Sequence, residues 1–125
     1  MKRLWYIFGI LLVVILAGCG ISSEGYKNIS SEEAKQLIDN QEVVVLDVRT
    51  TEEYQEGHIP SAIWLPLQEL ETKFSDLDKD QAYLVVCRSG NRSAQASENL
   101  SNNQFNTVYN MTGGMNSWSY EIVNE

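Results

Sequence analysis

Cys87 begins a segment whose residue types could carry chemistry, Cys87-Arg88-Ser89-Gly90-Asn91-Arg92-Ser93. The apolar run from Tyr83 to Val86 precedes this segment and predicts a buried strand, whereas residues 93–102 (SAQASENLSN) predict a helix. In an open α/β sheet, ligands bind at the carboxyl ends of the strands, and Cys87 falls at such an end. The segment therefore predicts a nucleophilic cysteine in a strand-to-helix loop.

The loop after Cys87 has the features of an anion-binding cradle. Successive backbone N–H groups of such a loop can point at one spot, and the positive end of the following helix reinforces them. Gly90 permits backbone conformations that side chains with a Cβ avoid, and Arg88 and Arg92 add positive charge. Cysteines in such surroundings titrate at roughly pH 3.5–7.5 instead of about 8.5. We therefore predict a thiolate that attacks an anionic substrate.

Strands and helices must alternate along the chain to position this loop. A capping box from Ser30 to Glu33 predicts a helix that ends near Asn40, and Thr50 or Thr51 can cap a helix that ends at Gly57. Apolar runs predict strands at 43–46, 63–65, 83–86 and 107–109, and helical spacing predicts further helices over 67–77, 93–102 and 115–122. This alternation predicts a parallel α/β sheet in a single domain.

The first twenty residues of the 125-residue chain differ from the rest. Lys2 and Arg3 form a basic start, and residues 4–17 are apolar or glycine without a charge. This run is shorter than the roughly 20 residues of a membrane-spanning helix and fits the apolar core of a secretory signal. The sequence Leu-Ala-Gly-Cys at 16–19 resembles the lipobox of bacterial lipoproteins, which implies that Cys19 is lipidated and becomes the first residue of the mature chain.

These features predict a lipoprotein signal peptide over 1–18, a lipidated cysteine and flexible tether over 19–28, and the folded domain over 29–125. The alternative is an uncleaved anchor over residues 4–21, with Cys19 an ordinary cysteine at the membrane edge. Both interpretations place the domain outside the cytoplasm. In the lipoprotein interpretation it is anchored to a bacterial cell membrane and lies on the extracytoplasmic side.

The negative charge of the chain limits the kinds of partner that it can bind. The full chain carries 9 basic and 17 acidic residues, and removal of residues 1–18 leaves 7 basic residues and a net charge of −10. Such a surface repels nucleic-acid phosphates and anionic lipid headgroups. We therefore expect no nucleic-acid binding, and membrane attachment through the lipid or the apolar segment. With Cys19 lipidated, Cys87 is the only thiol left and no intramolecular disulfide can form.

The loop CRSGNRS is similar to the active-site loop of rhodanese-type sulfurtransferases. Further matches follow the family order along the chain: 46–49 (LDVR), 53–54 (EY) and 57–60 (GHIP) look like its N-terminal signature, and Gly113-Gly114 with Trp118 looks like its C-terminal one. The resemblance implies a rhodanese-like α/β fold, with a five-stranded, mainly parallel sheet flanked by helices on both faces. The apolar runs supply four strands, and the fifth is expected near Ile29, before the first helix.

The resemblance also implies a mechanism. The Cys87 thiolate attacks the outer sulfur of a donor such as thiosulfate, sulfite leaves, and the persulfide on Cys87 passes its sulfur to cyanide, a small thiol or a protein thiol. Backbone N–H groups of the loop stabilise the persulfide, and Arg92 together with Arg88 holds the donor's oxygens. No metal or organic cofactor is needed. The implied substrate-binding residues are Arg88, Ser89, Gly90, Asn91, Arg92 and Ser93.

Two alternatives stay open. Cysteine phosphatases also place an arginine at a helix start after a strand-end cysteine, but with five intervening residues, whereas four separate Cys87 from Arg92. The shorter loop makes a tighter cradle, which suits a sulfur atom on the cysteine better than a phosphoryl group. The second alternative is a catalytically idle binding module of the same fold, although such modules commonly lack the cysteine.

Other polar and aromatic residues receive structural interpretations. We expect His58 to organise the turn before the strand at 63–65, and Asp47 and Arg49 to form an ion pair that fixes loops. Trp64 stands where the family commonly has a small polar residue. We expect it near the mouth of the site, where it would influence the choice of acceptor.

Overall fold

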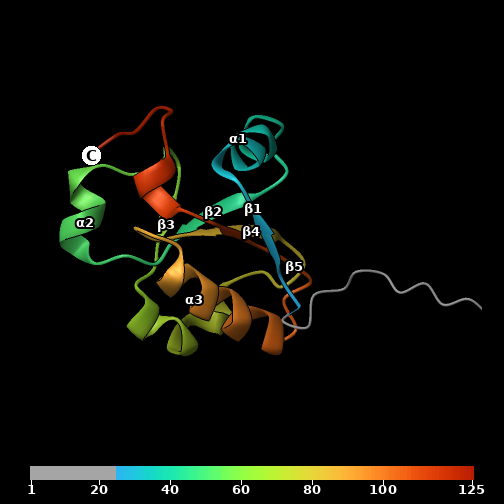
Figure 1. Ribbon diagram of the computed structural model, residues 1–125. Helices are drawn as coiled ribbons and strands as arrows, with labels where there is room; N and C mark the ends of the chain where they lie inside the picture. Colours follow the sequence, from blue (N-terminus) through green and yellow to red (C-terminus); the bar gives the residue numbers. More distant parts are fainter. Residues whose placement is uncertain (1–24) are drawn as a thin grey trace, which may run out of the picture.

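The computed structural model describes residues 25–125, which form a parallel sheet between two helical layers (Figure 1). The sheet order is β1-β5-β4-β2-β3, and all four pairings are parallel. The strands are β1 (Lys27–Ile29), β2 (Val44–Asp47), β3 (Ile63–Trp64), β4 (Ala82–Val86) and β5 (Thr107–Met111). The predicted five-stranded sheet is confirmed, with its fifth strand at Ile29. Residues 27 and 28, which were assigned to the tether, belong to that strand.

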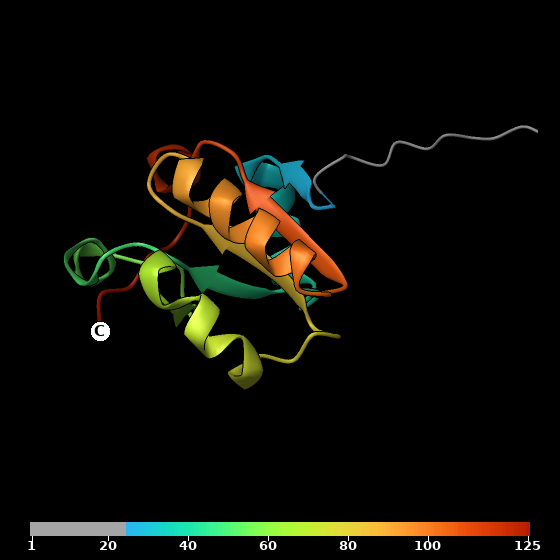
Figure 2. The same ribbon diagram turned by 90° about the horizontal axis from the view of Figure 1, so that it is seen from below.

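Helices cover both faces of the sheet. In Figure 1, α1 lies above the sheet while α3 and the 3-10 turns before β4 lie below it, and Figure 2 views this second layer directly. The α-helices are α1 (Ser31–Asp39), α2 (Thr51–Glu56) and α3 (Asn91–Asn102). The 3-10 helices are η1 (Leu67–Glu69), η2 (Glu71–Asp76) and η3 (Gly114–Ser117).

The predicted capping box of α1 is present, and α2, for which Thr50 or Thr51 was expected as the cap, begins with a second box. The Ser30 hydroxyl accepts the N–H of Glu33 at 3.1 Å, and the Glu33 carboxylate accepts the N–H of Ser30 at 3.1 Å. The same reciprocal pair joins Thr50 and Glu53 at the start of α2, at 3.2 and 3.0 Å. Each pair satisfies two backbone donors that a helix start leaves without intrahelical partners. Local sequence therefore determines where α1 and α2 begin.

Two predicted helices are wrong. Residues 67–77 form the 3-10 helices η1 and η2 instead of one α-helix, although the spacing of Leu67, Leu70, Phe74 and Leu77 also fits an α-helix. The expected helix over 115–122 is only the short turn η3. After it the chain runs extended, and Val123 pairs with His58 in an antiparallel bridge.

The core is divided by the sheet into two clusters. Along β4, Tyr83 and Val85 pack on the side of α3, whereas Leu84 and Val86 pack on the side of α1. Burial of each such side chain contributes roughly 1.5–3 kcal/mol, and a strand that is covered on both faces must be apolar at every position. The last residue of the α3-side cluster along this strand is Cys87, which is completely buried.

Candidate active site

Cys87 lies directly after β4, at the carboxyl edge of the central strands. The chain then turns back over it, so that the backbone N–H of Gly90 donates to its Sγ at 3.1 Å and the N–H of Ser93 at 3.3 Å. The Ser93 hydroxyl oxygen lies 3.3 Å from the same sulfur. The predicted cradle of backbone donors is therefore present, and it is centred on the sulfur atom.

The sulfur of Cys87 takes the place of an N-cap side chain for α3. Gly90 is the N-cap residue, adopts the left-handed conformation with φ 107°, and has no side chain to cap the helix. The N–H of Ser93, three residues further on, is the donor that an N-cap side chain ordinarily satisfies, and here it donates to Cys87. Because α3 has no acidic residue in its first turn, the sulfur is the anionic group at the positive end of this helix.

This environment favours the thiolate. Burial alone raises the pKa of the Cys87 thiol, but the hydrogen bonds from Ser93, Gly90 and Ser89 outweigh burial and hold the pKa below its ordinary value. A thiolate is the reactive form of cysteine in nucleophilic attack. The geometry thus supports the predicted nucleophile.

The turn at η3 holds the loop of residues 87–93, called the cysteine loop below, in place. The N–H of Met115 donates to the carbonyl of Cys87 at 2.8 Å, and the N–H of Asn116 donates to the carbonyl of Arg88 at 3.0 Å. A Cβ on Gly114 would lie 2.5 Å from the carbonyl oxygens of both loop residues, so this approach requires glycine. The sequence marked Gly113 and Gly114 as a turn, but it carried no local signal that this turn supports the cysteine loop.

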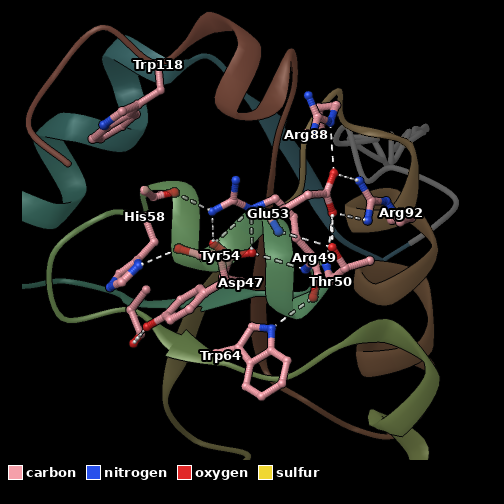
Figure 3. Close-up of polar contacts among 12 residues, drawn as sticks. Asp47, Arg49, Thr50, Glu53, Tyr54, His58, Trp64, Arg88, Arg92 and Trp118 are labelled. Atoms are coloured by element: carbon pink, nitrogen blue, oxygen red, sulfur yellow. Dashed lines mark hydrogen bonds and ion pairs between the residues drawn. The ribbon is translucent and has the colours of Figure 1, made fainter. Parts of the chain in front are cut away.

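Glu53 binds both arginines of the loop, as Figure 3 shows. Its carboxylate accepts Nε of Arg88 at 2.8 Å and Nη1 and Nη2 of Arg92 at 2.8 and 2.9 Å. The hydrogen bond from Arg92 is the largest influence and, with those from Thr50 and Arg88, holds the pKa of Glu53 well below its ordinary value although burial opposes this. The arginines that were expected to hold a donor's oxygens are therefore already paired with a carboxylate.

The other predicted residues support neighbouring loops. Asp47 and Arg49 form the expected ion pair at 2.8 Å, fully buried on the Asp47 side, and Arg49 also donates to the carbonyl of Gly57 at 2.8 Å. His58 is buried, stacks on Tyr54 with ring centroids 3.7 Å apart, and donates from Nδ1 to the Tyr54 carbonyl at 2.9 Å, which agrees with the predicted role in organising the turn.

Trp64, Ser89 and Asn91 are exposed. Trp64 is 37 % exposed, and its indole N–H donates to the carbonyl of Arg49 at 2.9 Å (Figure 3). Its influence on acceptor choice stays a prediction. Cys19 lies outside the described residues, and within residues 25–125 no cluster of three histidine, cysteine, aspartate or glutamate side chains is placed to hold a metal ion.

A small cavity of about 230 Å³ adjoins the loop. It lies between α2, the cysteine loop and the segment after η3 that contains Ile122. Its walls include Glu53, Arg88, Asn116 and Trp118. The carboxylate of Glu53 therefore borders both the arginines and a space in which a small molecule can approach the loop.

Known proteins share this sequence pattern and this architecture. Residues 30–121 match the family model of the rhodanese-like domain. The chain is 37% identical over 92 residues to a sulfurtransferase of Allochromatium vinosum, with 73% of this chain and 86% of that protein covered. It is 34% identical over 93 residues to the thiosulfate sulfurtransferase GlpE of Coxiella burnetii, with 74% and 87% covered. By contrast, it spans half the length of the Bacillus subtilis relative YrkF.

A solved structure agrees with the sequence matches. The rhodanese-related protein of Thermoplasma volcanium superimposes with a TM-score of 0.74 at 38% sequence identity, over 80% of this chain and 100% of that one. The aligned region is thus the whole of that solved chain.

Proposed function

Because the chain belongs to the rhodanese-like family, we propose that it is a sulfurtransferase that moves a sulfane sulfur from an anionic donor such as thiosulfate, through a persulfide on Cys87, to a thiophilic acceptor. The observation that carries this proposal is the sulfur of Cys87 held by the N–H groups of Gly90 and Ser93. The relatives named as sulfurtransferases, in which this chain covers most of the length, support the same reaction class.

The reaction proceeds by two displacements at sulfur. The Cys87 thiolate attacks the outer sulfur of thiosulfate, a sulfur–sulfur bond forms, and the bond between the two sulfurs of thiosulfate breaks, so that sulfite leaves with the electron pair. A cyanide ion or an acceptor thiolate then attacks the outer sulfur of the persulfide, and Cys87 leaves as the thiolate. No net oxidant is consumed, and the thiolate is regenerated.

The loop lowers the energy of both the thiolate and the persulfide of Cys87. Its N–H groups are oriented before the reaction begins, so little reorganisation accompanies the movement of charge between Cys87 and the outer sulfur. Arg88 and Arg92 give the loop a positive field at the surface, where an anionic donor arrives and sulfite departs. The cavity beside Arg88 offers space for a small acceptor next to the loop.

The test uses residues 20–125. Every strand and both core clusters lie within 27–123, and the Thermoplasma volcanium chain consists only of the aligned unit, so this fragment is expected to fold by itself. The fragment and its Cys87→Ala variant are incubated with thiosulfate, their intact masses are measured, and cyanide is then added. We expect the mass of one added sulfur atom on the wild type only, followed by its loss with formation of thiocyanate.

A folded, reduced wild type that gains no sulfur from thiosulfate, from a thiosulfonate or from an organic persulfide would contradict the proposal. Binding of an anion without transfer would then favour the idle binding module. Hydrolysis of an aryl phosphate by the wild type, abolished in Cys87→Ala, would favour the phosphatase.

We further propose that Cys19 is lipidated and anchors the domain on the extracytoplasmic side of a bacterial cell membrane. The support is the apolar run and the lipobox-like tetrapeptide, both in the part of the chain outside the described residues. Within residues 25–125 no helix has the length and apolar character to cross a membrane. The test is labelling of the full chain with radioactive palmitate in a bacterial host. We expect label and membrane association in the wild type and in Cys87→Ala, and neither in Cys19→Ala, whereas label in Cys19→Ala would contradict the anchor.

A further inference from the structure

We propose that Glu53 determines donor specificity by lowering the preference of the cysteine loop for dianionic donors relative to donors of smaller charge. This inference rests on the proposed sulfurtransferase function. Glu53 is a positioning residue here, because it acts through Arg88 and Arg92 and does not touch the reacting sulfur.

The geometry gives Glu53 an unusually complete set of donors. Its two carboxylate oxygens accept three hydrogen bonds from the guanidinium groups of Arg88 and Arg92, and two more from the N–H and hydroxyl of Thr50, all between 2.8 and 3.1 Å. The side chain of Glu53 is only 13% exposed, whereas Arg88 is 55% and Arg92 33% exposed. The carboxylate is thus more buried than the guanidinium groups that it binds, and both arginines keep surface that a donor can reach.

The charge of this cluster is therefore smaller than the loop sequence indicates. Two guanidinium groups and one carboxylate leave a single net positive charge. A donor that binds to the arginines meets their attraction together with the repulsion of Glu53, and both terms scale with the charge of the donor. A dianion such as thiosulfate suffers twice the repulsion of a monoanion.

The negative charge of Glu53 is not needed to start α2. Glutamine serves equally at this position of a capping box, because only a side-chain oxygen is required to accept the N–H of Thr50. Helix α1 carries the same box with Glu33, and within residues 25–125 that carboxylate has no arginine partner. The charge at residue 53 therefore has a role beyond helix capping, and Glu33 offers a matched control.

The experiment compares two sulfur donors in three proteins. Thiosulfate carries two negative charges, and methanethiosulfonate carries one and releases methanesulfinate. Steady-state kinetics with cyanide as acceptor are measured for the wild type, Glu53→Gln and Glu33→Gln. At low salt we expect Glu53→Gln to lower KM roughly tenfold for thiosulfate and about threefold for methanethiosulfonate, since the energy is proportional to charge, and the effect to shrink at high salt. Glu33→Gln is expected to leave both KM values unchanged.

Equal changes for both donors in Glu53→Gln would show a merely structural role and would overturn the proposal, as would unchanged KM values. A fall in kcat alone, with the ratio of the two KM values preserved, would also overturn it.

A second measurement does not depend on sulfur transfer. Iodoacetate and iodoacetamide are nearly the same size and differ by one negative charge. Both must reach the buried Cys87 through the same opening of the site, so this opening does not affect the ratio of their alkylation rates. We expect Glu53→Gln to raise the iodoacetate-to-iodoacetamide ratio about threefold, and Glu33→Gln to leave it unchanged. If the wild type transfers no sulfur but this ratio rises, the proposed function fails while the electrostatic role of Glu53 stands; an unchanged ratio overturns that role.

Discussion

Ser93 contacts the sulfur of Cys87 twice, through its backbone N–H and through its hydroxyl, each at 3.3 Å. The two residues lie six positions apart, and the completely buried Ser93 comes from the first turn of α3. One residue thus links the start of this helix to Cys87. When the thiol ionises, both donors of Ser93 face a full negative charge.

Replacement of Ser93 by alanine removes the hydroxyl and leaves the backbone donor. Because this hydroxyl lowers the pKa of Cys87, the pKa is expected to rise in Ser93→Ala, and the rate of sulfur loading at neutral pH to fall by roughly tenfold, since hydrogen bonds to charged groups contribute about 1.5–3 kcal/mol. The pH dependence of alkylation by iodoacetamide reports the pKa directly.

The matched control is Ser97→Ala, one turn later in α3. Ser97 is also completely buried, and within the described part of the chain its hydroxyl has no hydrogen-bond partner. Its loss is expected to leave the pH profile of Cys87 unchanged. An identical shift in both variants would show that any polar deletion in α3 disturbs the thiol, contrary to the specific role of Ser93.

Gly114→Ala is expected to destabilise the domain by about 3 kcal/mol and to slow sulfur loading. The new Cβ would lie 2.5 Å from the carbonyls of Cys87 and Arg88, and these backbone atoms cannot move without displacing the cysteine loop. Urea unfolding measures the stability. Gly113→Ala provides the comparison, because Gly113 shares the positive φ of Gly114 but its Cβ meets only the side chain of Ser117, whose Oγ can turn away, and no backbone of the cysteine loop. Equal losses in the two variants would contradict the support given by Gly114.

Much of this site was predictable because its central part is local in sequence. The buried strand, Cys87 and the start of α3 follow one another directly, so apolar patterning and helix-start chemistry sufficed to predict the cradle. The starts of α1 and α2 were predictable for the same reason. The three-residue β1 was expected only from the family resemblance, because so short a strand has almost no periodicity of its own.

What the sequence did not predict depends on distant contacts. Glu53 reaches Arg88 and Arg92 across 35 and 39 residues, and its local role as a capping residue gave no indication of a second one. The prediction of a final helix was wrong because the chain after Ser117 pairs through Val123 with His58, a distant contact that helical spacing does not show. Such tertiary contacts override local propensity.

The stability contributed by Glu53 is expected to depend on pH. Its pKa in the folded chain lies below the ordinary value of 4.5, so the unfolded chain binds the proton first as pH falls. The contribution is therefore complete above that value and is lost progressively below it. Urea unfolding of the wild type and Glu53→Gln at several pH values should show a difference in the free energy of unfolding that shrinks as pH falls from neutral to about 3.

Arg92→Gln tests whether this dependence comes from the ion pair. In that background the effect of Glu53→Gln should be smaller at neutral pH, because the partner that lowers the pKa most is absent. A difference that stays constant with pH in both backgrounds would show that the pairing does not contribute to stability.

Asp47→Asn is expected to lower the free energy of unfolding by about 3–5 kcal/mol, because it leaves the buried guanidinium of Arg49 without its charge partner. The double variant Asp47→Asn, Arg49→Met removes both charges and is expected to recover part of this loss. Urea unfolding of the single and double variants measures the coupling. If the double variant lost as much stability as the two single variants together, Asp47 and Arg49 would not stabilise each other, and the prediction would be contradicted.

The substitution of a reactive sulfur for a helix cap ties the folding equilibrium of the domain to the chemical state of one atom. The thiol, thiolate, persulfide and oxidised acids of Cys87 differ in charge and in the position of their acceptor atoms, so each satisfies the N–H of Ser93 to a different degree. Any reagent that shifts these states is then linked thermodynamically to unfolding, in the same way as a bound ligand. The melting temperature is therefore expected to be a label-free measure of the chemical state of Cys87 in a given sample.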